Sequence, residues 1–132
     1  MVDQFKVLGK PMNAPSKDLE TFLRPDHVTE VVFTTDELTS YCPVTEQPDF
    51  NRLEILYNPD QLCVESKSLK LYLWTFRDER IFGEGLAGTI AADIYRKLKP
   101  FYCRITLIQN VRGGLQMRAV AELGDVNRRL AE

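Results

Sequence analysis

Two side chains that can do covalent and acid–base chemistry stand in one short stretch, residues 39–50. Cys42 is followed by Pro43, and Asp49 is preceded by Pro48. Because a proline restricts the backbone beside it, both the thiol and the carboxylate are presented at a limited range of angles in a loop. A thiol near a carboxylate can be a nucleophile with an acid–base partner. The alternative is a small buried cysteine and an aspartate in a turn, and the spacing alone does not decide between them.

Strand-like runs on both sides predict that this loop joins two paired strands. Residues 28–34 are rich in β-branched side chains. After the loop, Leu53, Ile55 and Tyr57 alternate with polar residues around one exception, Leu56, and 58–60 (Asn-Pro-Asp) ends the run. We therefore expect the second strand to pair back on the first.

Two helices are predicted next. From Ser66 the apolar residues recur with a helical period and form one stripe. Further apolar residues lie on a second side of the same helix, and this side must also be covered. Residues 85–99 carry apolar residues four apart, and Pro100 ends that helix. The first stripe consists of Leu69, Leu73 and Phe76 with Tyr72 beside them, the second side of Leu71 and Trp74, and the second helix carries Leu86, Ile90, Ile94 and Leu98.

The ends of the chain complete the predicted architecture. Residues 101–107 and 115–122 alternate as two strands around the turn at Arg112-Gly113-Gly114, and the tail from 124 is expected to be a frayed or short helical end. Residues 1–27 predict an extended arm with at most one helical turn near 16–20. The prediction is one α+β domain over 1–132, with four antiparallel strands under a pair of helices.

Bulk composition favours a small-molecule partner. The 132 residues carry a net charge of -2, which leaves no electrostatic footprint for nucleic acid or an anionic membrane. Since no apolar run approaches ~18 residues and the N-terminal residues lack the pattern of a signal peptide, we expect a cytoplasmic protein. Cys42, Cys63 and Cys103 are too widely spaced for a disulfide framework or a zinc site, and the single histidine, His27, cannot build a histidine metal centre. We expect free thiols, no metal, and His27 at the surface or in a turn.

Two long stretches resemble one known family. Residues 36–50 are similar to the active-site loop of the 7-cyano-7-deazaguanine reductases, the NADPH-dependent nitrile reductases of queuosine biosynthesis, and residues 65–72 are similar to that family's signature at a helix start. Weaker similarity lies at 5–22 and at Arg112-Gly113-Gly114. The resemblance implies the tunnelling fold, in which subunits join their sheets into a barrel and place active sites between them. An open sheet has two unpaired edges, and joining identical sheets removes them, so we expect a homo-oligomer.

The resemblance also implies roles for single residues. Cys42 matches the nucleophile that attacks the nitrile carbon to give a thioimide, after which two hydride transfers from two NADPH release the amine. Asp49 matches the general acid. Glu84 matches the glutamate that anchors the base, although by itself it is an acid at a helix start, where capping is the ordinary role.

The signature stretch is linked to both substrate and cofactor by the same resemblance. Glu65 and Ser66 are expected at the substrate, and Ser66, Lys67, Ser68 and Lys70 at NADPH, where the lysines offer charge to phosphate. Without this resemblance, residues 65–70 would be interpreted as the solvent-exposed start of a helix.

One substitution separates the chain from the pattern and leaves two rivals open. Where the family has Phe-His-Glu, this chain has Phe82-Gly83-Glu84, and the extension that the family often carries after its Arg-Gly-Gly turn is missing. The first rival function is an amidine-forming, archaeosine-synthase-like enzyme that adds ammonia to the same thioimide. The second is a non-catalytic module that binds the deazapurine. The retained signature at 65–72 favours the reductase.

Overall fold

A computed structural model describes residues 14–127 of the chain. Residues 1–13 of the predicted arm and residues 128–132 of the tail lie outside the described part. The elements run β1 (Thr21–Leu23), β2 (Val31–Tyr41), β3 (Pro48–Asn58), β4 (Leu62–Val64), α1 (Ser66–Trp74), α2 (Gly83–Leu98), β5 (Tyr102–Arg112) and β6 (Leu115–Gly124).

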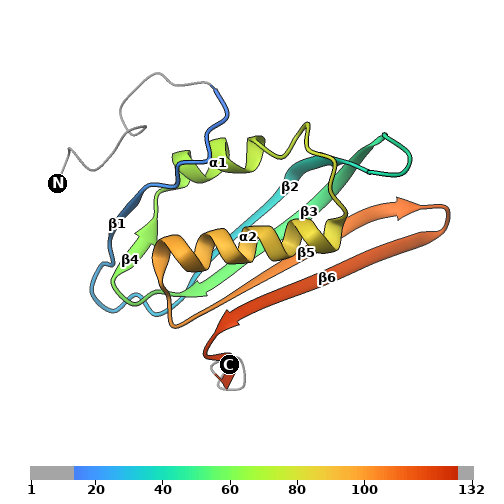
Figure 1. Ribbon diagram of the computed structural model, residues 1–132. Helices are drawn as coiled ribbons and strands as arrows, with labels where there is room; N and C mark the ends of the chain where they lie inside the picture. The colour runs from blue at the N-terminus through green and yellow to red at the C-terminus, as the bar shows by residue number, and fades with distance from the viewer. Residues whose placement is uncertain (1–13, 128–132) are drawn as a thin grey trace.

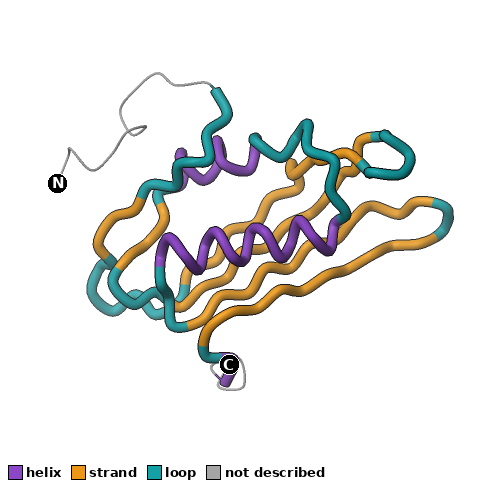
Figure 2. The backbone as a smooth tube through the Cα atoms, viewed as in Figure 1, coloured by secondary structure: helices purple, strands orange, loops and turns teal. Residues whose placement is uncertain are grey.

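The main sheet confirms the predicted α+β class. Its four strands lie in the order β2-β3-β5-β6, and each neighbouring pair is antiparallel. Both helices lie on the same side of it, with α2 across β5 and β6 and α1 beside β2 (Figures 1 and 2). None of the helices within residues 14–127 is long and apolar enough to cross a membrane.

The core forms between this sheet and α2 because alternate strand residues point to one face. The middle of β3 and β5 supplies the sheet side, and α2 supplies most of the other side, with Leu69 and Tyr72 of α1 in the same cluster. The row on β3 continues past Leu53 to Asn51 and Asp49, and the row on β5 continues past Leu107 to Gln109. The apolar members are Leu53, Ile55 and Tyr57 on β3, Cys103, Ile105 and Leu107 on β5, and Leu86, Ile90, Ile94 and Leu98 on α2. Because the two rows end in Asn51, Asp49 and Gln109, one end of the helix-covered face is polar.

The N-terminal segment contains a strand that was not predicted. Residues 16–20 form no helical turn, and β1 pairs with β4 in a small antiparallel sheet that the sequence did not predict. The backbone N–H of Glu65 donates to the carbonyl of Glu20 at 2.8 Å, which extends this connection to the start of α1. Strands of three residues are too short to show alternation, so their pairing depends on tertiary contacts.

The remaining elements were predicted with shifted ends. The first strand of the sheet is longer than the predicted 28–34, because β2 continues to Tyr41 through an irregularity between Thr35 and Leu38. There the Thr35 hydroxyl accepts the N–H of Glu37 at 3.0 Å. The helix predicted from 85 already begins at Gly83. The longer β2 brings the sheet directly to Cys42.

Candidate active site

Cys42 is the first residue after β2, at the base of the loop that joins β2 to β3. Its N–H donates to the carbonyl of Gln47 at 3.0 Å, and its own carbonyl accepts the N–H of Glu46 at 2.9 Å. Tyr41 is paired with Pro48 and Ser40 with Asp49 across the two strands. The thiol therefore stands on a short loop closed by its own backbone, as the strand–loop–strand prediction required.

The surroundings of Cys42 favour the thiolate. Hydrogen bonds from the Thr45 side chain, then from the backbone of Thr45 and Val44, lower the pKa of the Cys42 thiol. All three cysteines are free thiols, but Cys63 and Cys103 are buried. Burial raises the pKa of Cys103 to about 11. Cys42 is thus the thiol best suited to act as a nucleophile.

Asp49 lies close to this thiol and is held by two donors from β5. Its side chain is buried on the helix-covered face of the sheet. Arg112 Nη1 lies 3.4 Å from Oδ1, and Gln109 Nε2 lies 3.4 Å from Oδ2. Arg112 also donates to the carbonyl of Pro48. The negative charge of Asp49 raises the pKa of the Cys42 thiol and so opposes the hydrogen bonds that lower it. This is the smallest of the effects on that pKa. The structure therefore brings the predicted thiol and carboxylate into one site.

A backbone connection places Glu84 at the same end of the molecule. The Tyr41 N–H donates to the carbonyl of Glu79 at 2.8 Å, and the Tyr41 carbonyl accepts the N–H of Ile81 at 3.0 Å. This parallel bridge ties the segment before α2 to the residue before Cys42. Glu84 follows in the first turn of α2, with an exposed side chain.

The carboxylate of Glu65 is committed to the start of α1. Its Oε1 accepts the N–H of Ser68 at 2.8 Å and its Oε2 the N–H of Lys67 at 2.7 Å. The Ser68 hydroxyl is fully buried, donates to the Glu65 carbonyl at 2.9 Å and accepts the Glu20 N–H at 2.9 Å. Glu65 and Ser68 thus join α1 to the segment around β1.

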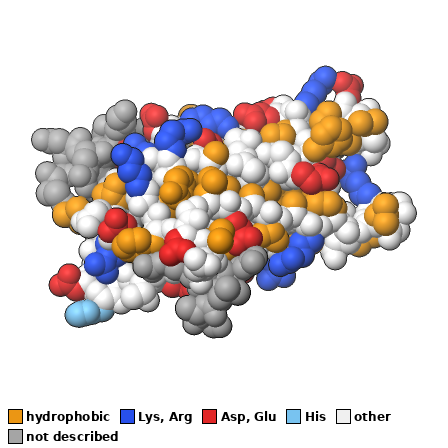
Figure 3. Space-filling view, turned by 60° about the horizontal axis from the view of Figure 1, so that its bottom comes forward, with side chains coloured by type: hydrophobic (Ala, Val, Ile, Leu, Met, Phe, Trp, Pro, Cys, Tyr) orange, Lys and Arg blue, Asp and Glu red, His pale blue; other side chains and the backbone are white. Residues whose placement is uncertain are grey.

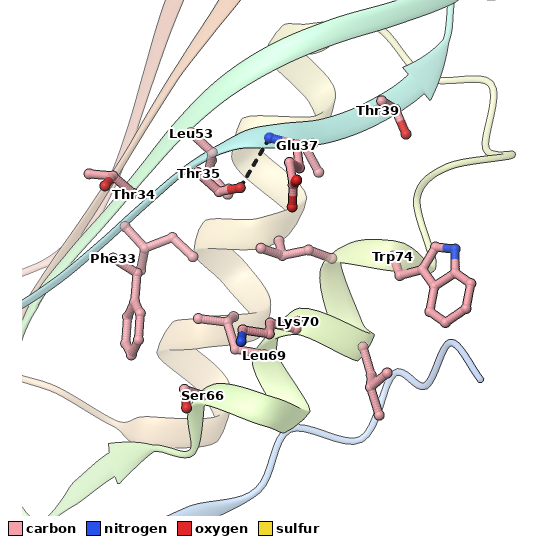
Figure 4. Close-up of a pocket in the computed structure, with 14 residues that line it drawn as sticks. Phe33, Thr34, Thr35, Glu37, Thr39, Leu53, Ser66, Leu69, Lys70 and Trp74 are labelled. Atoms are coloured by element: carbon pink, nitrogen blue, oxygen red, sulfur yellow. Dashed lines mark hydrogen bonds between the residues drawn. The ribbon is translucent and has the colours of Figure 1, made fainter. Parts of the chain in front are cut away.

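Ser66 and Lys70 face a cavity of about 500 Å³ between α1 and β2 (Figure 4). The strand side offers hydroxyl groups and the helix side offers Lys70, with aromatic rings at Phe33 and Trp74. The hydroxyl groups belong to Thr34, Thr35 and Thr39.

Neither Cys42, Asp49 nor Glu84 lines this cavity. Cys42 follows Thr39 by three residues, which is roughly 10 Å along a strand. Within one chain the predicted residues therefore form two groups, one at the end of β2 and one between β2 and α1. The reactive group holds Cys42 and Asp49 with Glu84 near it, and the cavity group holds Ser66 and Lys70.

His27 lies exposed in the turn before β2, with a φ of 72°, as predicted for a surface or turn histidine. Among residues 14–127, no three His, Cys, Asp or Glu side chains are grouped so that they could hold a metal ion.

Sequence reasoning missed Gln109 and the contact that Arg112 makes. Arg112 was assigned only to a turn. Gln109 carried a usable signal, because it continues the apolar row of Cys103, Ile105 and Leu107 with a polar side chain. A polar residue in a core-facing position of a strand needs a partner, and here the partner is Asp49.

The fold and the site define an α+β protein with a cysteine of lowered pKa on the loop before a buried carboxylate. A family model described as QueF-like protein matches residues 48–128, and the chain belongs to this family.

Relatives match nearly the whole chain. A protein of Syntrophus aciditrophicus is 46% identical over 123 residues, which cover 92% of this chain and 87% of the relative. A protein of an Anaeromyxobacter species is 42% identical over 113 residues, covering 84% of this chain and 93% of the relative. Both are named NADPH-dependent 7-cyano-7-deazaguanine reductase.

A solved structure supports the fold. The crystal structure of the archaeosine synthase QueF-Like in the apo form superimposes with a TM-score of 0.70. The match covers 74% of this chain and 96% of that chain at 23% identity, so we use it for the fold alone.

Proposed function

We propose that this chain is an NADPH-dependent nitrile reductase that converts 7-cyano-7-deazaguanine to 7-aminomethyl-7-deazaguanine. The names of its relatives support the reaction. The observation that carries the proposal is the Cys42 thiol of lowered pKa beside Asp49, whose two oxygens face Gln109 and Arg112. This pairing fits attack on an electrophilic carbon followed by protonation.

The proposed covalent step uses only these two residues. The Cys42 thiolate adds to the nitrile carbon, so that a C–S bond forms and one carbon–nitrogen π bond breaks. The nitrogen takes the proton of a protonated Asp49, which becomes a carboxylate, and the product is a neutral thioimide on sulfur. Conversion to the amine would need two hydrides and one further proton, and the Cys42 sulfur would leave as a thiolate between the two hydride additions. Bound NADPH would supply the hydrides.

Glu84 is the proposed anchor of the base. Its carboxylate is exposed in the first turn of α2, so both oxygens can accept hydrogen bonds from a guanine-like edge. Glu65 and Ser66 are proposed as further substrate contacts, where Glu65 would bind substrate through the same carboxylate that accepts the N–H groups of Lys67 and Ser68.

The cavity between α1 and β2 fits part of a dinucleotide. Lys70 and the hydroxyl of Ser66 line it opposite the threonines of β2, and its volume is in the range of ligand pockets. We propose that Ser66 and Lys70 contact NADPH directly and that the cation of Lys67 adds to them. Ser68 was also predicted at the cofactor, but because its hydroxyl is buried and bonded we give it the role of holding the start of α1.

A homo-oligomer with sites between subunits is proposed because one chain keeps the two groups apart. The outer strands β2 and β6 are open edges of the sheet in one chain. Leu115, Val120 and Leu123 on β6 are exposed, and hydrophobic side chains appear in a broken band on the face shown in Figure 3. Joining sheet edges into a ring would cover these strands. The three free thiols suit a reducing compartment such as the cytoplasm.

The test mixes purified protein with the nitrile base. We expect an intact-protein mass increase equal to the mass of the base, lost in Cys42→Ala and kept in Cys63→Ala and Cys103→Ala. NADPH absorbance should then fall as amine forms. An adduct that persists in Cys42→Ala would contradict the nucleophile. Amidine formed from ammonium without loss of NADPH would replace the reductase with the amidine-forming rival, and an adduct without turnover would indicate a binding module.

A further inference from the structure

We propose that Gln109 is the positioning residue for Asp49, and that glycine at position 83 is what leaves room for it. The inference rests on the proposed function, since Asp49 is the proton donor there. It assigns a task to a residue that lies outside both the active-site loop and the signature at 65–72.

The contacts of Asp49 carry the first part. Gln109 Nε2 lies 3.4 Å from Oδ2, and Arg112 Nη1 lies 3.4 Å from Oδ1. Each oxygen thus has its own donor, both donors come from β5, and the Asp49 side chain is buried. With a donor on each oxygen, rotation of the carboxylate would break both contacts. The two side chains therefore fix the orientation of the Asp49 carboxyl group.

The lack of space around Gly83 supports the claim that glycine leaves room for Gln109. A Cβ atom at this position would lie 2.7 Å from Gln109 Nε2 and 2.4 Å from Met117 Cε, well inside normal contact distances. Gly83 does not have a left-handed backbone, so its conformation does not require glycine. Glycine is also a poor helix former, and Gly83 is the first residue of α2. The amide of Gln109 occupies the volume that a side chain at 83 would take.

The chemistry of the amide explains why glutamine suits the position. A buried carboxylate needs donors, and a primary amide gives two without adding charge. The atoms in the way of a side chain at 83 are the flexible ends of Gln109 and Met117, so they can move without the backbone. A larger residue at 83 should therefore displace the amide from Asp49 while the fold persists.

The experiment compares Gln109→Ala with Gln116→Ala, which makes the same change at an exposed glutamine of β6. With the nitrile base and NADPH, Gln109→Ala should lower kcat about tenfold or more while KM changes little, as expected for misplacement of a reacting group. Gln116→Ala should match the wild type. The proposal would be overturned if Gln116→Ala lowered kcat as much as Gln109→Ala does, or if Gln109→Ala did not lower kcat.

Gly83→Ala tests the spatial claim by a double-mutant cycle. Alone it should lower kcat about as much as Gln109→Ala, whereas in the Gln109→Ala background it should add less than about twofold, because the amide that contacts Asp49 is already absent and only the flexible end of Met117 is left to displace. Independent, additive losses would separate Gly83 from Gln109 and contradict the proposal. Thermal unfolding of each variant checks that the fold is retained.

A readout without turnover separates this inference from the proposed function. Iodoacetamide labelling of Cys42 as a function of pH reports the charge of Asp49 near the thiol. Gln109→Ala should shift the midpoint of this profile, and the shift should vanish when Asp49 is also changed to Asn. An unshifted profile overturns the positioning role. A shifted profile in a protein that neither forms the adduct nor consumes NADPH would keep the positioning role and reject the reductase.

Discussion

Tyr41 and Arg80 form a parallel backbone bridge that joins the end of β2 to the segment before α2. Because Cys42 directly follows Tyr41 and Glu84 follows Arg80 by four residues, this bridge fixes the proposed nucleophile relative to the proposed base anchor. The Arg80 side chain adds an ion pair to Glu46 in the Cys42 loop at 2.6 Å. The loop is thus attached to the start of α2 by both backbone and side chain.

The Arg80–Glu46 ion pair should matter more for reactivity than for stability. Both side chains are largely exposed, so Arg80→Ala should lower the free energy of unfolding by only about 0.2–1 kcal/mol. The loop that carries Cys42 would lose one of its attachments, and adduct formation with the nitrile base should slow. Arg52→Ala, which breaks the exposed pair with Asp36, is the control and should leave the adduct rate unchanged. Equal adduct rates in both variants would show that the backbone bridge is sufficient.

Lys70 should affect the cofactor and not the thiol. Removing one charge-assisted contact by Lys70→Ala should raise the KM for NADPH roughly tenfold, and the Cys42 adduct should form at the wild-type rate. Lys97→Ala, in the exposed last turn of α2, is the matched control. Steady-state kinetics with NADPH as the varied substrate measures the effect. A tenfold loss in the adduct rate with an unchanged KM would move Lys70 from the cofactor to the substrate.

The sheet and helices were predictable because each has enough residues to show its period. Alternation identified the sheet strands, and apolar residues four apart identified α2 from Leu86 to Leu98. The ends were less accurate, since β2 continues through an irregularity at Thr35 that interrupts the alternation. The pairing of β1 with β4 depends on residues about 40 positions apart and had no local signal.

The chemical pair was predictable, but its support was not. Cys42 and Asp49 are close in sequence and adjacent in a hairpin, so local geometry unites them. Gln109 is 60 residues from Asp49 and reaches it only because β5 pairs with β3. In the sequence, Gly83 lacks the side chain of the histidine that the family has at this position. In the structure, side-chain atoms of Gln109 and Met117 occupy the volume that a side chain at 83 would take. Such compensation becomes visible only in three dimensions.

Stability should fall on the alkaline side. Burial raises the pKa of Cys103 from 9.0 to about 11, and burial with the hydrogen bond to Glu122 raises that of Tyr102 from 10.0 to about 12. The folded chain therefore retains protons that the unfolded chain releases above about pH 9, so stability is fully present below that pH and is lost as pH rises towards 12. Denaturant unfolding at several pH values measures this. The decline should be shallower in Cys103→Ala and Tyr102→Phe, each compared with its own value at neutral pH, and a stability that does not change over this range would contradict the burial of both groups.

Asp49→Asn should have opposite effects on the two halves of the reaction. The Asp49 charge raises the pKa of the Cys42 thiol, so its removal should lower that pKa further and make iodoacetamide labelling faster below the midpoint of the profile. The same variant lacks the proposed acid, so amine formation should slow by ~100-fold or more while the adduct still forms with a proton from water in place of the one from Asp49. Asp36→Asn, an exposed acid on β2, should change neither rate. Slower labelling in Asp49→Asn would instead make Asp49 a base that activates the thiol. An unchanged rate of amine formation would leave it without a part in proton transfer, and Gln109 and Arg112 would then hold a carboxylate that only stabilises the hairpin.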